Sequence, residues 1–162
     1  MELAETKDAA LSKVGKYAES LTYFDTAIAL NPDHENAWYN KGLSLNKLGK
    51  YELAIESFDE AIRINPVNAD AWYSKANAYN KLKQYDDAVS AYEKVIEFNP
   101  ENANAWNNKG NALYNKYISG SDDISLLVKA NEAYKKALWE DPYNSNAAKF
   151  ASITRKLIAD KK

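Results

Sequence analysis

The sequence contains no cysteine, and this absence excludes several kinds of chemistry at once. Without a thiol, the chain can form neither a disulfide nor a thiolate metal site, and it has no cysteine nucleophile. Histidine occurs once, as His34, in a predicted turn beside Pro32 and Asp33, and no glycine-rich loop of the phosphate-binding kind is present. The sequence therefore argues against an enzyme, and we expect no cofactor and no metal ion.

An excess of charge of one sign and long apolar segments are also missing. The 162 residues include 21 Lys and Arg and 23 Asp and Glu, for a net charge of −2, without a block of like charges. A nucleic-acid-binding surface or an acidic disordered tail is therefore not indicated. No apolar run is long enough to span a bilayer, and nothing resembles a signal peptide. We expect a soluble cytoplasmic protein that binds neither nucleic acid nor membranes.

Proline is scarce, with only 4 residues, and its positions define a repeat. A spacing of 34 residues connects Pro32, Pro66 and Pro100, and likewise Trp38, Trp72 and Trp106. The fourth proline, Pro142, follows after 42 residues, so the fourth repeat has eight additional residues. Self-similarity at this period indicates stacked supersecondary units rather than one globular core. The predicted repeats are approximately 1–34, 35–68, 69–102 and 103–144, followed by a helix at 145–162.

Each repeat has the pattern of two helices. In the second repeat, apolar residues recur every three or four positions over residues 37–48 and again over 53–64. Gly49 lies between these segments, and glycine readily adopts the left-handed angles that follow a helix end. Pro66 ends the second helix because proline has no amide hydrogen and disfavours helical angles at Asn65. The predicted fold class is all-α, built from antiparallel helix pairs.

Small residues mark the places where paired helices approach closely. Gly42, Ala76 and Gly110 share one position on the first helix of three repeats. Large residues on the second helices would fill the complementary spaces, since interdigitation of large and small side chains gives dense packing. These large residues are Phe24, Phe58, Tyr92 and Tyr134. We also interpret the three periodic tryptophans as buried packing residues rather than as a ligand platform.

The order of these residues within a repeat is similar to the signature of the tetratricopeptide repeat (TPR) family. One copy consists of Trp38, Gly42, Leu45, Ala54, Phe58, Ala61 and Pro66, and the next of Trp72, Ala76, Tyr79, Ala88, Tyr92, Val95 and Pro100. The resemblance covers nearly the whole chain. It implies a single TPR domain, a right-handed superhelical solenoid in which the first helix of each pair lines a concave groove that binds peptides or partner proteins.

The groove positions that the resemblance implies are rich in asparagine and tyrosine. An asparagine amide offers both donors and an acceptor, so a row of them suits the main chain of an extended peptide. Tyrosine adds an apolar face with a polar tip. The alternative is that the asparagines only keep an exposed helix face soluble. The candidate peptide-binding residues are Asn36, Tyr39, Asn40, Asn46, Lys47, Tyr73, Asn77, Asn80, Lys81, Asn104, Asn107, Asn108, Asn111 and Tyr114.

Some members of the family hold the C-terminus of a chaperone with a two-carboxylate clamp, and this sequence does not supply one. The clamp requires lysine, asparagine and arginine at set groove positions of three successive repeats. Counted from the third repeat, Asn77 and Asn108 fit, but Tyr73 replaces a lysine, and Asn146 and Phe150 stand where two cations are needed. Capture of a chaperone tail is therefore not predicted.

A lysine recurs three residues after the tryptophan position, as Lys7, Lys41, Lys75 and Lys109. A ladder of cations of this kind could recognise an acidic ligand. We expect instead that the stems pack on apolar surface and that the ammonium groups reach water.

Residues 117–124 contain the insertion in the fourth repeat. Glycine, two serines and two aspartates give this segment the composition of a loop, and Asp122 and Asp123 are candidates to cap the following helix. Insertions in repeat proteins often lie on a functional face, but lengthening of the helix pair is an equally good interpretation.

We predict a non-catalytic scaffold for protein–protein interaction that binds an extended peptide or a partner protein. The alternative is a self-assembly module that uses its end helices or its groove. In the last segment, Phe150, Ile153, Leu157 and Ile158 lie on one face, which is typical of a capping helix that buries one side. We expect a monomer or a weak homo-oligomer.

Overall fold

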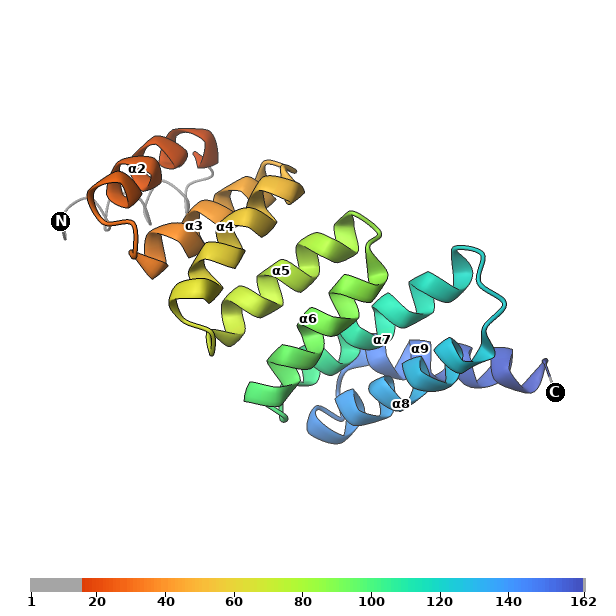
Figure 1. Ribbon diagram of the computed structural model, residues 1–162. Coiled ribbons are helices and arrows are strands. Elements are labelled where there is room, and N and C mark those ends of the chain that lie inside the picture. Colours follow the sequence, from red (N-terminus) through yellow and green to blue (C-terminus); the bar gives the residue numbers. More distant parts are fainter. Residues whose placement is uncertain (1–15, 162) are drawn as a thin grey trace. The chain divides into compact units, whose positions relative to one another are not determined.

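The computed structural model describes residues 16–161 and shows only helices as regular secondary structure in that range (Figure 1). Residues 1–15 and 162 lie outside the described residues, and so do the predicted first helix of repeat 1 and Lys7. The all-α prediction is confirmed. The helices are α2 (Tyr17–Leu30), α3 (Glu35–Lys47), α4 (Tyr51–Ile64), α5 (Ala69–Lys81), α6 (Tyr85–Phe98), α7 (Ala103–Ile118), α8 (Ile124–Glu140) and α9 (Ser145–Ala159).

The chain divides into two compact units, Met1–Leu82 (unit 1) and Lys83–Lys162 (unit 2). In unit 1, α2 packs on α3, α3 on α4 and α4 on α5, and α3 also contacts α5. In unit 2, α6 packs on α7, α7 on α8 and α8 on α9, and α7 also contacts α9. Within each unit, the first helices of two successive pairs therefore come into contact, as stacked helix pairs require. The boundary between the units falls inside the predicted repeat 69–102.

Asparagines begin three of the helices. The side-chain oxygens of Asn68, Asn102 and Asn144 accept hydrogen bonds from the backbone N–H three residues on, at 2.8, 3.0 and 3.0 Å. A side-chain acceptor at this position satisfies an amide that has no partner within the helix. In the turn after α3, Gly49 has φ +74°, as its position predicts. Lys83 takes a φ of +61° at the equivalent position one period later.

Glycine allows direct contact between an aromatic ring and a helix backbone in both units. A Cβ atom added to Gly42 would lie 2.5 Å from Cε1 of Phe58, and one added to Gly110 would lie 2.7 Å from Cε1 of Tyr134. Both rings are fully buried. The predicted pairing of small and large residues is confirmed at these two contacts.

The periodic tryptophans are only half-buried, so the prediction that they are buried is wrong. Each indole Nε1 donates a hydrogen bond to the carbonyl oxygen of the proline six residues earlier. The bonds run from Trp38 to Pro32, Trp72 to Pro66 and Trp106 to Pro100, at 2.9, 2.9 and 2.8 Å. Because the indole edge must reach this carbonyl near the surface, the ring lies across the preceding turn. Because this hydrogen bond joins the tryptophan and the proline of each repeat, it accounts for the common 34-residue period of the two residue types.

The insertion lengthens a helix pair and adds little to the turn. Helix α7 has 16 residues where α3 and α5 have 13, and α8 has 17 where α4 and α6 have 14. The connecting turn, residues 119–123, is two residues longer than the turn at 48–50. The predicted loop is therefore too long, because Tyr117 and Ile118 are helical. As predicted for this pair of aspartates, Asp123 caps α8 by accepting from the backbone N–H of Ser125 at 2.9 Å.

Candidate peptide-binding faces

The candidate residues of unit 1 lie on α3 and α5, which are in contact. Tyr39 of α3 is half-buried, and its ring centroid lies 6.0 Å from that of Phe58. Burial raises the pKa of Tyr39, opposed by a hydrogen bond with Ser74 of α5 and assisted by the charge of Asp70. Tyr39 therefore joins α3 to α5 as well as contributing to their shared face. The other candidates here are Asn36, Asn40, Asn46 and Lys47 on α3, and Tyr73, Asn77, Asn80 and Lys81 on α5.

In unit 2, the candidate residues of α7 form a hydrogen-bonded network. Asn108 Oδ1 accepts from Asn107 Nδ2 at 3.0 Å and from Asn111 Nδ2 at 3.4 Å. Asn111 Oδ1 in turn accepts from the hydroxyl of buried Tyr134 at 2.9 Å. Burial, with a smaller contribution from Tyr114, raises the pKa of Tyr134, so this hydroxyl keeps its proton. Asn111 is therefore hydrogen-bonded to a core residue although it is itself partly exposed. Asn104, in contrast, is exposed.

Two buried side-chain oxygens have no hydrogen-bond partner within residues 16–161, and both belong to candidate residues. They are Oδ1 of Asn80 and Oδ1 of Asn107. Asn107 is only 8% exposed, and its Nδ2 donates a hydrogen bond to Asn108. An unpaired buried acceptor costs about 1–3 kcal/mol, so native proteins retain few of them. These two carbonyl groups are unused acceptors for an N–H donor.

Helix α9 supplies Phe150, which the sequence analysis considered only as a clamp position and did not include among the candidate peptide-binding residues. Phe150 lies 42 residues after Asn108, one lengthened repeat later. Its ring centroid is 5.2 Å from that of Tyr114, edge to face, and 5.9 Å from that of Tyr134. The predicted buried face of α9 is only half-buried at Phe150, Ile153, Leu157 and Ile158, and the buried residues are Ala147, Ala151 and Thr154.

The small residues of α9 are buried because hydrogen bonds from α8 hold the two helices close together. Asn131 of α8 donates through Nδ2 to the carbonyl oxygen of Ala151 at 2.8 Å and to Thr154 Oγ1 at 2.9 Å. Only short side chains leave space for this close approach. The larger apolar residues are consequently displaced to the margin of the contact, where Phe150 meets α7.

The periodic lysines are engaged within the fold. Lys41 Nζ lies 2.8 Å from Asp25, Lys109 Nζ lies 2.8 Å from Glu93, and Lys75 forms an ion pair with Asp59. Each ammonium group also lies over the tryptophan of its own repeat. The distance from Nζ to the ring centroid is 5.1 Å for Lys41, 5.2 Å for Lys75 and 5.5 Å for Lys109. The stems pack on apolar surface as predicted, but the ammonium groups meet carboxylates as well as water. These three lysines connect neighbouring helix pairs and do not form a ladder of unpaired cations.

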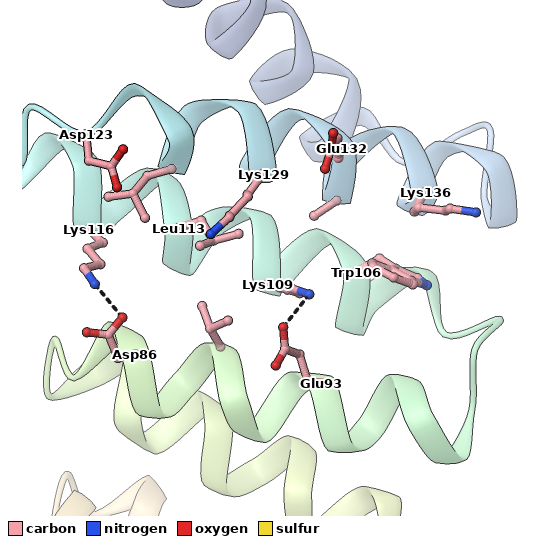
Figure 2. A pocket seen from close by; sticks show the side chains of 13 residues that line it. Asp86, Glu93, Trp106, Lys109, Leu113, Lys116, Asp123, Lys129, Glu132 and Lys136 are labelled. Carbon is pink, nitrogen blue, oxygen red and sulfur yellow. Dashed lines mark hydrogen bonds and ion pairs between the residues drawn. The ribbon is translucent and has the colours of Figure 1, made fainter.

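A separate cleft lies in unit 2 between α6, α7 and α8, away from the asparagine network (Figure 2). Its volume is about 600 Å³, and its apolar lining includes Val89, Leu113 and Leu126. A second cleft of about 620 Å³ lies in unit 1, where Leu21, Leu45 and Leu53 take part in the lining. Each cleft contains one tryptophan–lysine pair of the repeat.

Among residues 16–161, no helix is both long and apolar enough to cross a membrane. The same residues hold no group of three or more His, Asp or Glu side chains arranged to bind a metal ion.

Family models described as tetratricopeptide repeat match residues 10–69, 69–102 and 91–119. No curated protein sequence matches the chain. A crystal structure of MamA protein is 25% identical, with coverage of 87% of this chain and 73% of that one and a TM-score of 0.78. The structure of YrrB, described as a TPR protein with an unusual peptide-binding site, is 22% identical, with coverage of 98% and 78% and a TM-score of 0.81.

A third similar structure is the first TPR of Spaghetti (RPAP3) bound to an HSP90 peptide. It is 23% identical, with coverage of 77% of this chain and 93% of that one and a TM-score of 0.69. These likenesses establish a shared helical repeat fold.

Proposed function

The chain belongs to the tetratricopeptide repeat family, and we propose that it is a non-catalytic interaction protein that binds an extended peptide or an extended segment of a partner protein. Each unit offers one face for such a ligand, formed by α3 and α5 in unit 1 and by α7 and α9 in unit 2. The proposal includes a cytoplasmic location and neither a nucleic-acid nor a membrane partner. The net charge of −2 supports the absence of a nucleic-acid partner.

The unpaired amide oxygens of Asn80 and Asn107 carry this proposal. An extended peptide presents a main-chain N–H group at every residue other than proline, and these groups need acceptors when they are removed from water. Rotation of an asparagine side chain brings its oxygen to the helix surface, where a peptide N–H can reach it. The unpaired oxygens are difficult to explain by solubility alone, because a side chain that serves solubility is hydrated.

Similar structures support a peptide as the ligand class. YrrB is described as having an unusual peptide-binding site, and the Spaghetti domain is described as bound to an HSP90 peptide. The present chain has Asn146 and Phe150 at the positions where a two-carboxylate clamp needs cations. We therefore assign it to main-chain recognition with apolar contacts at Tyr114 and Phe150, rather than to recognition of a C-terminal carboxylate.

Selection of short peptides from a random library tests the proposal, followed by measurement of the dissociation constant of synthetic copies by fluorescence anisotropy. The informative variant is Asn107→Leu, which removes the unpaired oxygen and keeps the side chain close to its original volume. We expect peptide binding to weaken by about tenfold or more, the effect of losing one or two hydrogen bonds to a buried amide.

The fold of the same variant should keep about the same stability, because relief of the unpaired buried acceptor is offset by loss of the hydrogen bond from Asn107 Nδ2 to Asn108 Oδ1. The free energy of unfolding should change by less than about 1 kcal/mol. Asn99→Leu provides the matched control, because Asn99 is exposed and lies outside both candidate faces. If Asn107→Leu binds the selected peptides as tightly as the wild type, or if no peptides are selected, the proposal is wrong.

A further inference from the structure

Neither helix of the face formed by α7 and α9 supplies a carboxylate. The sequences of α7 and α9 contain no aspartate or glutamate, and the C-cap Asp160 is the first acidic residue after Asn144. In unit 1, by contrast, α5 carries Asp70 at the repeat position that Asn104 takes on α7 and Asn146 on α9. A ligand at the unit 2 face therefore meets amides, apolar groups and cations.

One edge of α9 carries two cations. Lys149 and Lys156 are exposed and form no ion pair with any residue in the range 16–161. They are seven residues apart, which is about two helical turns, so they lie on the same side of the helix. The ammonium nitrogen of Lys149 lies 5.6 Å from the centroid of the Phe150 ring. Even with Asp160 one turn beyond Lys156, this edge keeps a net positive charge.

An apolar row runs beside the two lysines. Phe150, Ile153 and Leu157 are half-buried and follow one another at steps of three and four residues, so they lie on one side of α9. Tyr114 of α7 adjoins this row, with its ring centroid 5.2 Å from that of Phe150. From Phe150 to Leu157 the helix rises about 10 Å, the length of about three residues of an extended peptide. The row can therefore accommodate more than one apolar side chain of such a peptide.

The register of the repeat explains why the side-chain oxygen of Asn107 is unpaired. In unit 1, Tyr39 of α3 forms a hydrogen bond with Ser74 of α5. When the eight additional residues of the fourth repeat are allowed for, the residue equivalent to Ser74 for Asn107 is Phe150. A phenyl ring offers no donor, so the amide oxygen of this residue, which is only 8% exposed, has no partner within residues 16–161. The unused acceptor therefore lies next to the start of the apolar row.

We propose that the face of α7 and α9 binds an internal segment of a peptide that combines apolar and acidic residues, an inference that rests on the proposed function. Apolar side chains of the segment pack on the row that begins at Phe150, and a main-chain N–H group donates to Asn107 Oδ1. Its acidic side chains meet Lys149 and Lys156. The unit 1 face is a poorer site for this segment, because Asp70 repels its carboxylates.

Each kind of contact has a separate role in recognition. The amide acceptor holds the main chain without demanding a particular residue, and the apolar row favours apolar side chains. The two lysines favour acidic residues and repel basic ones. Because both lysines are exposed, their contribution should decrease as the salt concentration rises, whereas the apolar contribution should persist.

Fluorescence anisotropy of the full chain with short labelled peptides, blocked at both ends, tests this. The first peptide has leucine and glutamate interspersed among serines, and in the others glutamine or lysine replaces glutamate, or serine replaces leucine. We expect the leucine–glutamate peptide to bind most tightly, the glutamine version about fivefold more weakly, and the lysine version more weakly still. Loss of the leucines should weaken binding by about tenfold or more. Because the blocked ends remove the C-terminal carboxylate, a two-carboxylate clamp cannot account for the binding.

Lys149→Glu with Lys156→Glu should invert the preference, so that the lysine peptide binds more tightly than the glutamate peptide. A misfolded variant cannot imitate this result, because the inverted preference requires an intact binding face. The control is Lys135→Glu with Lys136→Glu, which makes the same change of charge at exposed positions of α8 and should keep the preference for glutamate. Leu157→Ser should weaken the binding of every leucine-containing peptide and keep the same preference, and circular dichroism verifies that each variant is folded.

The inference is overturned if the peptides bind equally well whatever their charge, if the charge-reversed variant keeps the preference for glutamate, or if the control loses it. It is also overturned if none of these peptides binds while peptides of another composition are selected from the random library, and the proposed function then stands. If no peptide of any composition binds, both proposals are wrong. The two failures are therefore distinguishable.

Discussion

At the scale of single residues, the contact between α7 and α8 depends on the absence of a side chain at Gly110. Gly110 lies against the ring of Tyr134, and the fully buried ring is held by the hydrogen bond from its hydroxyl to Asn111. Because both the edge and the hydroxyl of the ring are fixed, the ring has little freedom to move away from a new atom. Helix propensity favours alanine here, and packing opposes it.

Gly110→Ala should destabilise unit 2. Overpacking of this kind costs about 1–3 kcal/mol, which exceeds the gain of up to about 1 kcal/mol from better helix propensity. Urea unfolding measures the difference. The penalty should shrink when Tyr134→Leu is also present, because the shorter side chain leaves space for the added methyl group. An equal penalty in both backgrounds would show that the ring is not the cause.

A second residue-scale prediction concerns the charge on Asp123. Hydrogen bonds from the side chain and backbone of Ser125 lower the pKa of this carboxyl group, and Lys129 and Lys116 assist. A lowered pKa means that the folded state favours the ionised form. The resulting stabilisation is complete above the pKa of the unfolded chain, about 4, and is lost as the pH falls through the lower folded value.

The stability of the wild type relative to Asp123→Asn should therefore decrease as the pH is lowered below about 4. Asparagine is an equally good cap without a titratable group, so the comparison isolates the charge. Urea unfolding at a series of pH values provides the measurement. A stability difference that stays constant from neutral to acidic pH would contradict the assignment.

At the scale of helices, most boundaries follow from residues near the ends of each element. Asn–Pro or Asp–Pro ends the second helix of each described pair, and Asn68, Asn102 and Asn144 begin the helices that come next. These local signals operate through the backbone of a few neighbouring residues. Helix boundaries were therefore predictable, except at the insertion, where loop-like residues gave no measure of how far the flanking helices extend.

Asn102→Ala should show the contribution of one such cap. Loss of the acceptor for the amide of Ala105 should lower the free energy of unfolding by about 1 kcal/mol, within a usual range of about 0.5–2 kcal/mol. Asn102→Asp keeps an acceptor and should retain most of the stability. Thermal and urea unfolding followed by circular dichroism give both values, and an equal loss in the two variants would contradict a capping role.

At the scale of the whole molecule, each unit has its own core. In unit 1, Leu45, Ala54 and Phe58 form a buried cluster, and in unit 2, Leu113, Tyr134 and Ala151 belong to another. Helices of a repeat protein contact only their neighbours, so a local change in packing has mainly local consequences. Stability should accordingly be distributed along the chain rather than shared equally by all helices.

Hydrogen exchange of Gly110→Ala tests this distribution. We expect faster exchange in α7 and α8, where the added methyl group disrupts packing, and little change in α3 and α4, whose core contains none of the affected side chains. The wild-type chain under the same conditions is the reference. A uniform loss of protection from α2 to α9 would show that the chain unfolds as one cooperative unit.

The sequence by itself determined the helix pairs, the period and the close contacts of Gly42 and Gly110, because these depend on local backbone preferences and on residues repeated at a constant spacing. It also located the asparagines of the candidate faces. Only the tertiary structure decided which atoms are left unpaired, that the periodic lysines are engaged with carboxylates, and that the tryptophans are half-buried. Those outcomes depend on which side-chain atoms come within contact distance when the helices pack, and the order of residue types along the chain does not specify this.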